Sequence, residues 1–229
     1  MILPIYLAMT PRQLEKYPQF LEKKAYMSCH FSASGQGLSN VPSKLPKDTT
    51  LILDDSTPVN GHDLSKILAD INALDPARVL LDMQRPATEE SSAIVKGIIE
   101  NLPCPVGVSI IYAGNYDCPV FVPPIPVWTE PEKYLSTWQG REIWLELSVD
   151  AVLAKITEKG TDFFWAEQVP NDLPTFYSEQ LYCHYCGREK EEHIDYFLWR
   201  TANDCRKLAE HSAKFGVTAA IGLFQQFYL

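Results

Sequence analysis

The chain has 229 residues, of which 46% are hydrophobic and 21% are charged. This balance is typical of a soluble globular protein with a substantial core. The formal net charge of −9 and the pI of about 5.0 argue against non-specific binding to nucleic acid or to an anionic membrane surface. No run of about 18 consecutive apolar residues occurs, so the sequence predicts no membrane span.

The first ten residues, Met1–Thr10, are apolar and contain no basic residue. An export signal begins with a positively charged segment, so we interpret this stretch as a first β-strand. The six cysteines are scattered apart from Cys183 and Cys186. Without an export signal, we expect them to be reduced thiols in a cytoplasmic protein.

Short apolar segments alternate with amphipathic segments along the chain, which is typical of repeated βα units. We predict strands at 2–8, 25–31, 50–54, 78–83, 105–112, 120–127, 141–147 and 217–224, and helices that begin at Pro11, Asp63, Thr88, Pro131 and Ile194. Prolines at 123, 124 and 126 remove hydrogen-bond donors, so the sixth strand must be short or irregular. Eight strands with mostly helical connections predict one domain over residues 1–229, a (β/α)8 barrel.

Residues 148–192 interrupt this alternation between the seventh strand and the last helix. They contain strand-like pieces at 152–157, 162–165 and 180–185. We therefore predict a small β-rich insertion before a helix that runs from Ile194 to Lys214.

The fourth predicted strand ends in a cluster of polar residues. Val79–Met83 is a run of apolar β-formers broken by Asp82, and Gln84 follows two residues later. Residues two apart on a strand share a face, and barrel active sites lie at the carboxyl ends of the strands. Asp82 and Gln84 are therefore expected to point into the same barrel mouth.

This segment resembles the fourth-strand signature of the chitinase-like (family 18) glycoside hydrolases, in which the strand ends in Asp-x-Asp-x-Glu. Asp82 matches the last Asp, Gln84 stands at the position of the catalytic Glu, and Leu80 stands at that of the first Asp. The position of the 148–192 insertion and the closing segment 215–224 are also similar to those of the family. The resemblance implies a barrel whose mouth binds amino sugars, with Asp82 steadying the N-acetyl group.

An amide cannot give up a proton as a carboxylic acid does, so Gln84 cannot act as the general acid. The sequence therefore favours a degenerate, non-catalytic barrel that binds a carbohydrate or a related polyol. Asp54, Tyr112 and Gln225 end the third, fifth and eighth predicted strands, and we expect them to contact the ligand beside Asp82 and Gln84.

Two alternatives remain open from the sequence. In the first, the protein is an active glycoside hydrolase in which Glu146 or Asp54 supplies the acid, paired with Asp82. In the second, the barrel is an interaction scaffold that binds no small ligand. Nothing in the sequence specifies an oligomeric state.

Cys183, Cys186 and His193 form the only pattern that suggests a metal site, with two thiols and an imidazole suited to zinc. A second Cys-x-x-Cys pair is missing, and a strand through this segment would point the two thiols to opposite faces. The sequence therefore favours no metal and implies no cofactor.

Overall fold

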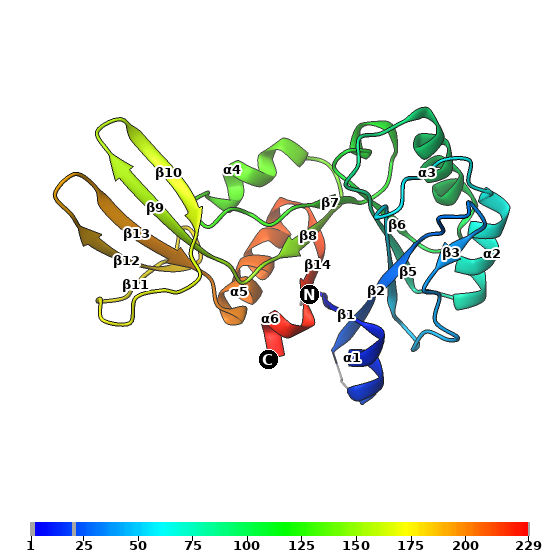
Figure 1. Ribbon diagram of the computed structural model, residues 1–229, viewed down its shortest axis with the longest axis horizontal. Helices are drawn as coiled ribbons and strands as arrows, with labels where there is room; N and C mark the ends of the chain where they lie inside the picture. Colours follow the sequence, from blue (N-terminus) through cyan, green and yellow to red (C-terminus); the bar gives the residue numbers. More distant parts are fainter. Residues whose placement is uncertain (1–2, 20–21, 229) are drawn as a thin grey trace.

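The computed structural model describes residues 3–19 and 22–228, and its centre is a closed barrel of eight parallel strands. The barrel strands are β1 (Ile5–Met9), β2 (Lys23–Phe31), β4 (Thr50–Asp54), β5 (Arg78–Asp82), β6 (Val106–Ser109), β7 (Val120–Val122), β8 (Ile143–Leu147) and β14 (Val217–Leu223). The first strand was expected to start at Ile2, which lies outside the described residues. The predicted (β/α)8 fold class is confirmed (Figure 1).

Strand β1 closes the barrel by pairing with strands from both halves of the chain. Ile5 is in register with Ala220 of β14, and Tyr6 is in register with Lys23 of β2. A short strand β3 (Leu38–Ser39) pairs antiparallel with β2 outside the ring.

The layer around the barrel is irregular. Its helices are α1 (Pro11–Lys16), α2 (Leu64–Leu74), α3 (Glu89–Asn101), α4 (Pro131–Leu135), α5 (Ala202–Ser212) and α6 (Phe224–Tyr228), with short 3-10 turns η1 (Ala113–Asn115), η2 (Ser136–Trp138) and η3 (Ala213–Phe215). The connection after β2 contains β3 and no helix among the described residues, and the connection after β6 contains only η1. None of the described helices is long and apolar enough to cross a membrane.

The two longest helices on one side of the barrel start at the predicted residues because side chains cap them. Asp63 accepts the backbone N–H of Ser65 at 3.0 Å, and Thr88 forms a reciprocal capping box with Ser91. These contacts satisfy backbone donors that the first turn of a helix leaves free. The apolar face of α2 then packs against the outer side of the barrel.

Large side chains fill the barrel interior. Tyr6, Ile52, Leu80, Phe121, Trp144 and Ile221 belong to this interior cluster. Gly107 of β6 makes room for the indole, because a Cβ at this position would lie 2.5 Å from Cε3 of Trp144. The interior of the barrel is therefore a packed core, and its free volume lies at the end where the parallel strands finish.

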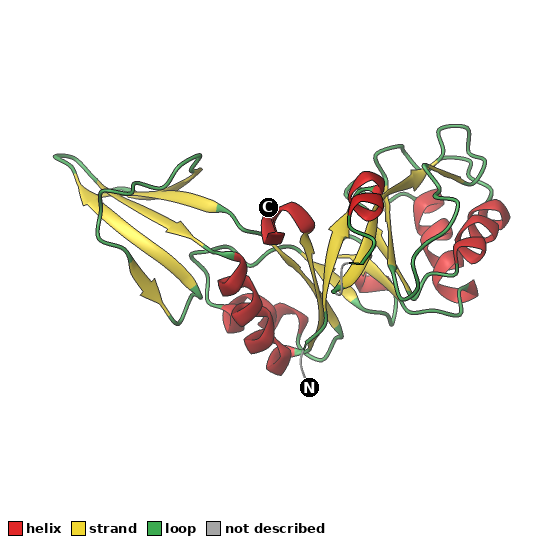
Figure 2. Cartoon of the chain, turned by 90° about the horizontal axis from the view of Figure 1, so that it is seen from below, coloured by secondary structure: helices red, strands yellow, loops and turns green. Residues whose placement is uncertain are grey.

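A second, antiparallel sheet lies between β8 and α5 along the chain. It contains β9 (Ala151–Thr157), β10 (Gly160–Trp165), β11 (Phe176–Ser178), β12 (Cys183–Glu189) and β13 (Ile194–Trp199), in the order β10-β9-β13-β12-β11. Figure 2 shows this sheet extending away from the barrel.

Most predicted strands agree with the structure to within a few residues at each end, and three predicted elements need a physical explanation for their different bounds. The expected helix from Ile194 is wrong over its first six residues: Ile194–Trp199 forms a strand because β9 and β12 pair with it on either side, and α5 starts after the Thr201 cap. The fifth strand ends at Ser109, not at Tyr112, because a turn in which the N–H of Tyr112 bonds to the carbonyl of Ser109 follows at once. The sixth ends at Val122, immediately before the prolines that cannot donate to a strand ladder.

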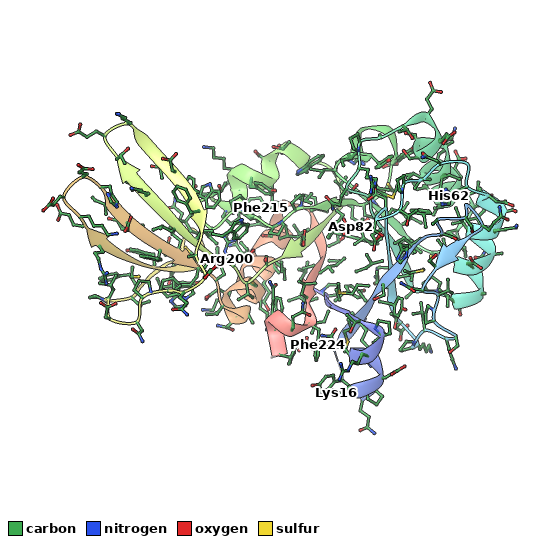
Figure 3. The ribbon with its side chains drawn as sticks, in the orientation of Figure 1. Lys16, His62, Asp82, Arg200, Phe215 and Phe224 are labelled. Atoms are coloured by element: carbon green, nitrogen blue, oxygen red, sulfur yellow. The ribbon has the colours of Figure 1, made fainter. Side chains whose placement is uncertain are left out.

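Arg200 joins the second sheet to the barrel (Figure 3). Its guanidinium donates hydrogen bonds to the carbonyls of Ile125 and Pro126 after β7, and to those of Leu181 and Tyr182 before β12. The side chain is buried, and this desolvation lowers the pKa of Arg200. Four carbonyl oxygens replace the water that the charge has lost.

Replacing Arg200 with Met should lower the free energy of unfolding by about 3 kcal/mol, because the carbonyls at this junction would lose their donor while remaining buried. Urea denaturation followed by circular dichroism measures this change. The matched control is Arg188→Met on the exposed part of β12, where an ion pair with Asp172 on the surface is worth less than about 1 kcal/mol. Equal losses in the two variants would contradict a special role for Arg200.

Candidate functional site

A cavity of about 120 Å³ lies at the end of the barrel where the parallel strands finish. Asp54 from β4, Asp82 from β5 and Glu146 from β8 line it together. Its remaining lining is mostly apolar and includes Met27, Ile52, Leu80, Phe121 and Ile221. No lysine, arginine or histidine is among its lining residues, so three acids share a mainly apolar space.

Strand parity explains why these three acids meet. Ile52 and Asp54 lie two apart on β4, as Leu80 and Asp82 do on β5 and Trp144 and Glu146 do on β8, so each acid follows an interior neighbour on the same face. Asp54 and Asp82 are also direct partners in the parallel register of the two strands.

Asp82 is held by the side chain of Gln84. The side-chain amide of Gln84 donates a hydrogen bond to Oδ1 of Asp82. Burial raises the pKa of Asp82, the hydrogen bond from Gln84 lowers it, and the charges of Asp54 and Asp55 raise it further. Gln84 itself is exposed and does not line the cavity, so its amide reaches Asp82 from the rim.

Asp55 braces the loop that carries Gln84. Its buried carboxylate accepts the backbone N–H groups of Gln84 and Arg85, each at 2.9 Å. Arg85 in turn donates to the carbonyls of Asp55 at 2.7 Å and Ser56 at 3.0 Å. These bonds hold together the segments that follow β4 and β5. The backbone of Gln84 therefore has a fixed position, from which its side-chain amide extends toward Asp82.

Among the three acids of the cavity, Glu146 has the pKa that departs most from its ordinary value. Burial raises its pKa to about 7, and the nearby charges of Asp82 and Asp150 add to this effect. Near neutral pH a substantial fraction of Glu146 is therefore protonated and can donate a hydrogen bond or a proton.

Two predicted ligand contacts lie away from this cavity. Tyr112 is only 1% exposed, belongs to the cluster between the barrel and its outer helices, and bonds through its hydroxyl to Oγ of Ser91 at 2.7 Å. Gln225 lies on α6, exposed, with its Oε1 3.4 Å from Nε2 of Gln13. We correct both positions: Tyr112 falls in a turn after β6, and the chain enters α6 before Gln225.

The weak zinc pattern is not assembled in the part of the chain that the structure describes, which holds no group of three acidic, histidine or cysteine side chains suited to a metal. Cys183 and Cys186 are buried at positions of β12 that face opposite sides of the sheet. His193 bonds to Asp195 at 3.2 Å.

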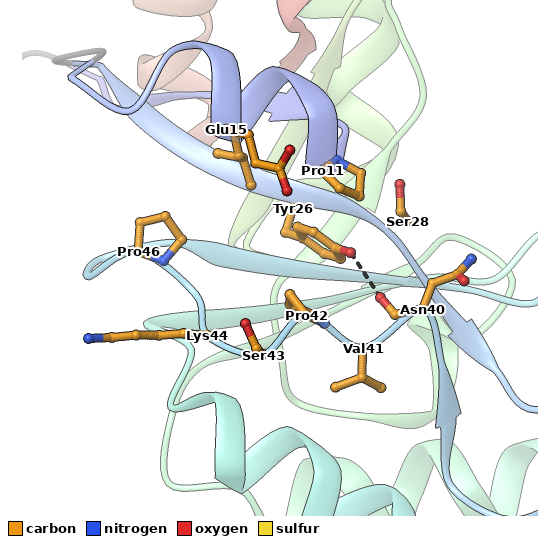
Figure 4. Close-up of a pocket in the computed structure, with 11 residues that line it drawn as sticks. Pro11, Glu15, Tyr26, Ser28, Asn40, Val41, Pro42, Ser43, Lys44 and Pro46 are labelled. Atoms are coloured by element: carbon orange, nitrogen blue, oxygen red, sulfur yellow. Dashed lines mark hydrogen bonds between the residues drawn. The ribbon is translucent and has the colours of Figure 1, made fainter.

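A larger cavity, of about 670 Å³, lies on the outside of the barrel between α1, β2 and residues 40–46 (Figure 4). Two of its lining residues are joined by a hydrogen bond, in which the Tyr26 hydroxyl donates to the carbonyl of Asn40 at 2.8 Å. Glu15 and Lys44 are the only ionisable groups besides Tyr26 in its lining. We place the candidate site at the barrel mouth instead, because acids from three separate strands converge there, whereas Glu15 is the one acid in the lining of the outer cavity.

Reasoning from the sequence missed the apolar walls of the cavity, including Met27 and Phe121. Phe121 lies in the strand that the prolines shorten, where a two-residue period is hard to recognise. The bonds of Asp55 to the backbone after β5 were also missed, because they depend on the alignment of β4 with β5 in the folded barrel.

No family model matches the sequence, and no curated protein matches it either. Solved structures do resemble the fold. A class V chitinase from Nicotiana tobaccum aligns with a TM-score of 0.62 and 8% identity over 100% of this chain and 95% of its own. A GH18 chitinase from Cycas revoluta, solved in complex with (GlcNAc)3, aligns with a TM-score of 0.55 and 8% identity over 96% and 94%.

A chitinase-like agglutinin from Robinia pseudoacacia aligns with a TM-score of 0.57 and 8% identity, over 96% of this chain and 94% of its own. At such low identity these likenesses show a shared fold. The structural neighbours of the chain thus include both GH18 chitinases and a chitinase-like agglutinin.

The raised pKa of Glu146 predicts a dependence of stability on pH. Between pH 4.5, the ordinary value for this group, and about 7, the unfolded chain loses the proton before the folded chain does, so the free energy of unfolding falls as pH rises. A pKa rise of this size corresponds to about 3 kcal/mol, and the loss is complete above pH 7. Glu146→Gln should therefore be more stable than the wild type at pH 8 and should lose this advantage below pH 4.5.

Urea denaturation at a series of pH values checks this prediction. Glu158→Gln, in the exposed turn between β9 and β10, is the control and should follow the wild type at every pH. If the difference between Glu146→Gln and the wild type were the same at all pH values, Glu146 would titrate normally.

Proposed function

We propose that the barrel mouth binds an oligosaccharide containing N-acetylated amino sugars and does not cleave it. The observation that carries this proposal is the hydrogen bond from Gln84 to Asp82 at the rim of the cavity. An amide in this position offers a donor and an acceptor to sugar oxygens or to an N-acetyl group, but it has no proton to deliver to a leaving group.

The mixed lining of the cavity supports the same proposal. Sugars present hydroxyl groups at their edges and C–H groups on their faces, so a site that combines carboxylates with apolar walls suits both surfaces. Asp54 and Asp82 supply acceptors, while Met27 and Phe121 supply the apolar contacts. The agglutinin and the (GlcNAc)3-bound chitinase among the structural neighbours make amino-sugar oligomers the first ligands to test.

Binding of (GlcNAc)3 should raise the melting temperature of the wild-type protein, because a ligand that binds only the folded state stabilises it by mass action. At a ligand concentration about 100 times the Kd, this stabilisation is about 2.7 kcal/mol. Asp82→Ala should abolish the shift, since it removes the acceptor at the centre of the site. Differential scanning fluorimetry makes the measurement.

The matched control is Asp172→Ala, which removes an exposed carboxylate from the loop between β10 and β11 and should retain the full shift. An unchanged melting temperature of the wild type with (GlcNAc)3 and with other glycans would contradict the proposal. In that case the alternative of an interaction scaffold would be favoured.

A second candidate function is supported by the raised pKa of Glu146. A carboxyl group that keeps its proton to about pH 7 can serve as a general acid, and Asp82 lines the same cavity as a potential carboxylate partner. Under this alternative the protein hydrolyses a glycoside with a relocated acid, and Asp54 is the other candidate for that role.

Turnover distinguishes the two functions. We expect the wild type to release no product from a chromogenic chito-oligosaccharide over hours, while Gln84→Glu should gain slow hydrolysis because it supplies a carboxyl group beside Asp82. Release of product by the wild type, abolished in Glu146→Gln, would establish the hydrolase with a relocated acid and overturn the non-catalytic proposal.

A further inference from the structure

The outer edge of the second sheet is an open strand. β10 ends the strand order β10-β9-β13-β12-β11, and all six of its residues are exposed (Figure 1). Phe163 is 40% exposed, Phe164 51% and Trp165 77%. A flat edge strand of this kind offers unpaired backbone groups to another chain.

The hairpin register shows which backbone groups face outward. The N–H of Ala166 bonds to the carbonyl of Ala151 at 2.9 Å, so hydrogen-bonded pairs with β9 recur at every second residue of β10 before Ala166. The N–H and C=O groups of Thr161, Phe163 and Trp165 therefore point away from β9. Among the described residues, no backbone partner for them lies within the chain.

Most natural edge strands are protected by lysines, prolines or a bulge. β10 has none of these, and Asp162 is its only charged residue. Trp128 from the loop after β7 stacks on Phe163, with ring centroids 4.1 Å apart, and fixes the orientation of that side chain. The edge is thus unprotected, and the ring of Phe163 is held by that of Trp128.

We propose that two copies of this chain associate by antiparallel pairing of β10 with β10 about a two-fold axis at Phe163, forming a continuous sheet across the dimer. This register is the one that uses all three outward-facing residues, since Phe163 then meets its own copy and Thr161 meets Trp165 of the partner. The same surface is used on both copies, so the assembly closes at two chains.

Charge supports this register. It brings the start of β10, next to Lys159 in the exposed β9–β10 turn, to the end of the partner strand, which Glu167 follows two residues later, and the symmetry repeats this approach of opposite charges. Among the described residues neither side chain has an ion-pair partner within its own chain, whose six ion pairs involve other side chains. Asp162 falls opposite Phe164, whereas a register centred on Asp162 would oppose two carboxylates.

Sedimentation equilibrium of the full chain tests the proposal at about 100 µM protein and about 50 mM salt, where exposed charges are weakly screened. The wild type should have a mass twice that of the 25.9 kDa chain. Lys159→Glu should raise the dimer Kd about tenfold or more, because it opposes two carboxylates at both ends of the pairing. The charge swap Lys159→Glu with Glu167→Lys should restore the wild-type Kd.

Lys47→Glu, an equal change of charge at an exposed site on the barrel, is the matched control and should leave the Kd unchanged. All substituted side chains are exposed, and circular dichroism verifies that each variant is folded. A monomeric wild type, a dimer indifferent to Lys159→Glu, or a mass that keeps growing with concentration would each overturn the proposal. A monomer whose tryptophan fluorescence responds to (GlcNAc)3, with the response lost in Trp165→Ala, would overturn it and assign this edge to sugar instead.

Discussion

The relation between the two sheets of this protein depends on one buried cation. Arg200 lies at the point where the chain leaves the second sheet and enters α5, and it gathers carbonyl groups from two loops that are distant in sequence. Burial of a guanidinium is costly unless its donors are satisfied. Carbonyl groups accept the hydrogen bonds of the guanidinium without adding a second charge. Because they lie on both sides of the junction, they hold the start of the second sheet in place against the barrel.

The barrel mouth has the opposite electrostatic character. Asp54, Asp82 and Glu146 converge with no basic side chain in the cavity lining. Burial and the neighbouring carboxylates disfavour the charged forms of Asp82 and Glu146, so the pKa values of both are raised. Stability alone would favour apolar residues at these positions. Proteins retain such arrangements mainly where a ligand or a proton is handled, which is why we assign function to this end of the barrel.

Sequence patterns predicted those elements that depend on interactions between residues close together in the chain. The bounds 50–54 and the Thr88 cap follow from an apolar run and a capping sequence, and the pocket acids follow from two-residue parity along strands already recognised. Ile194–Trp199 could not be predicted, because its strand conformation depends on pairing with β9, about 40 residues earlier in the chain. Tyr112 was misplaced since strand β6 ends three residues sooner than its apolar pattern indicates.

Closure of the barrel by β1 has a consequence for synthesis of the chain. Strand β1 pairs with β14, so the ring cannot close until residues 217–223 have emerged from the ribosome. The hairpins of the second sheet need only local contacts and can form earlier, while β1 and β8 still present open edges. The nascent protein therefore passes through a stage in which seven of the eight barrel strands are made but the ring is still open between β1 and β8.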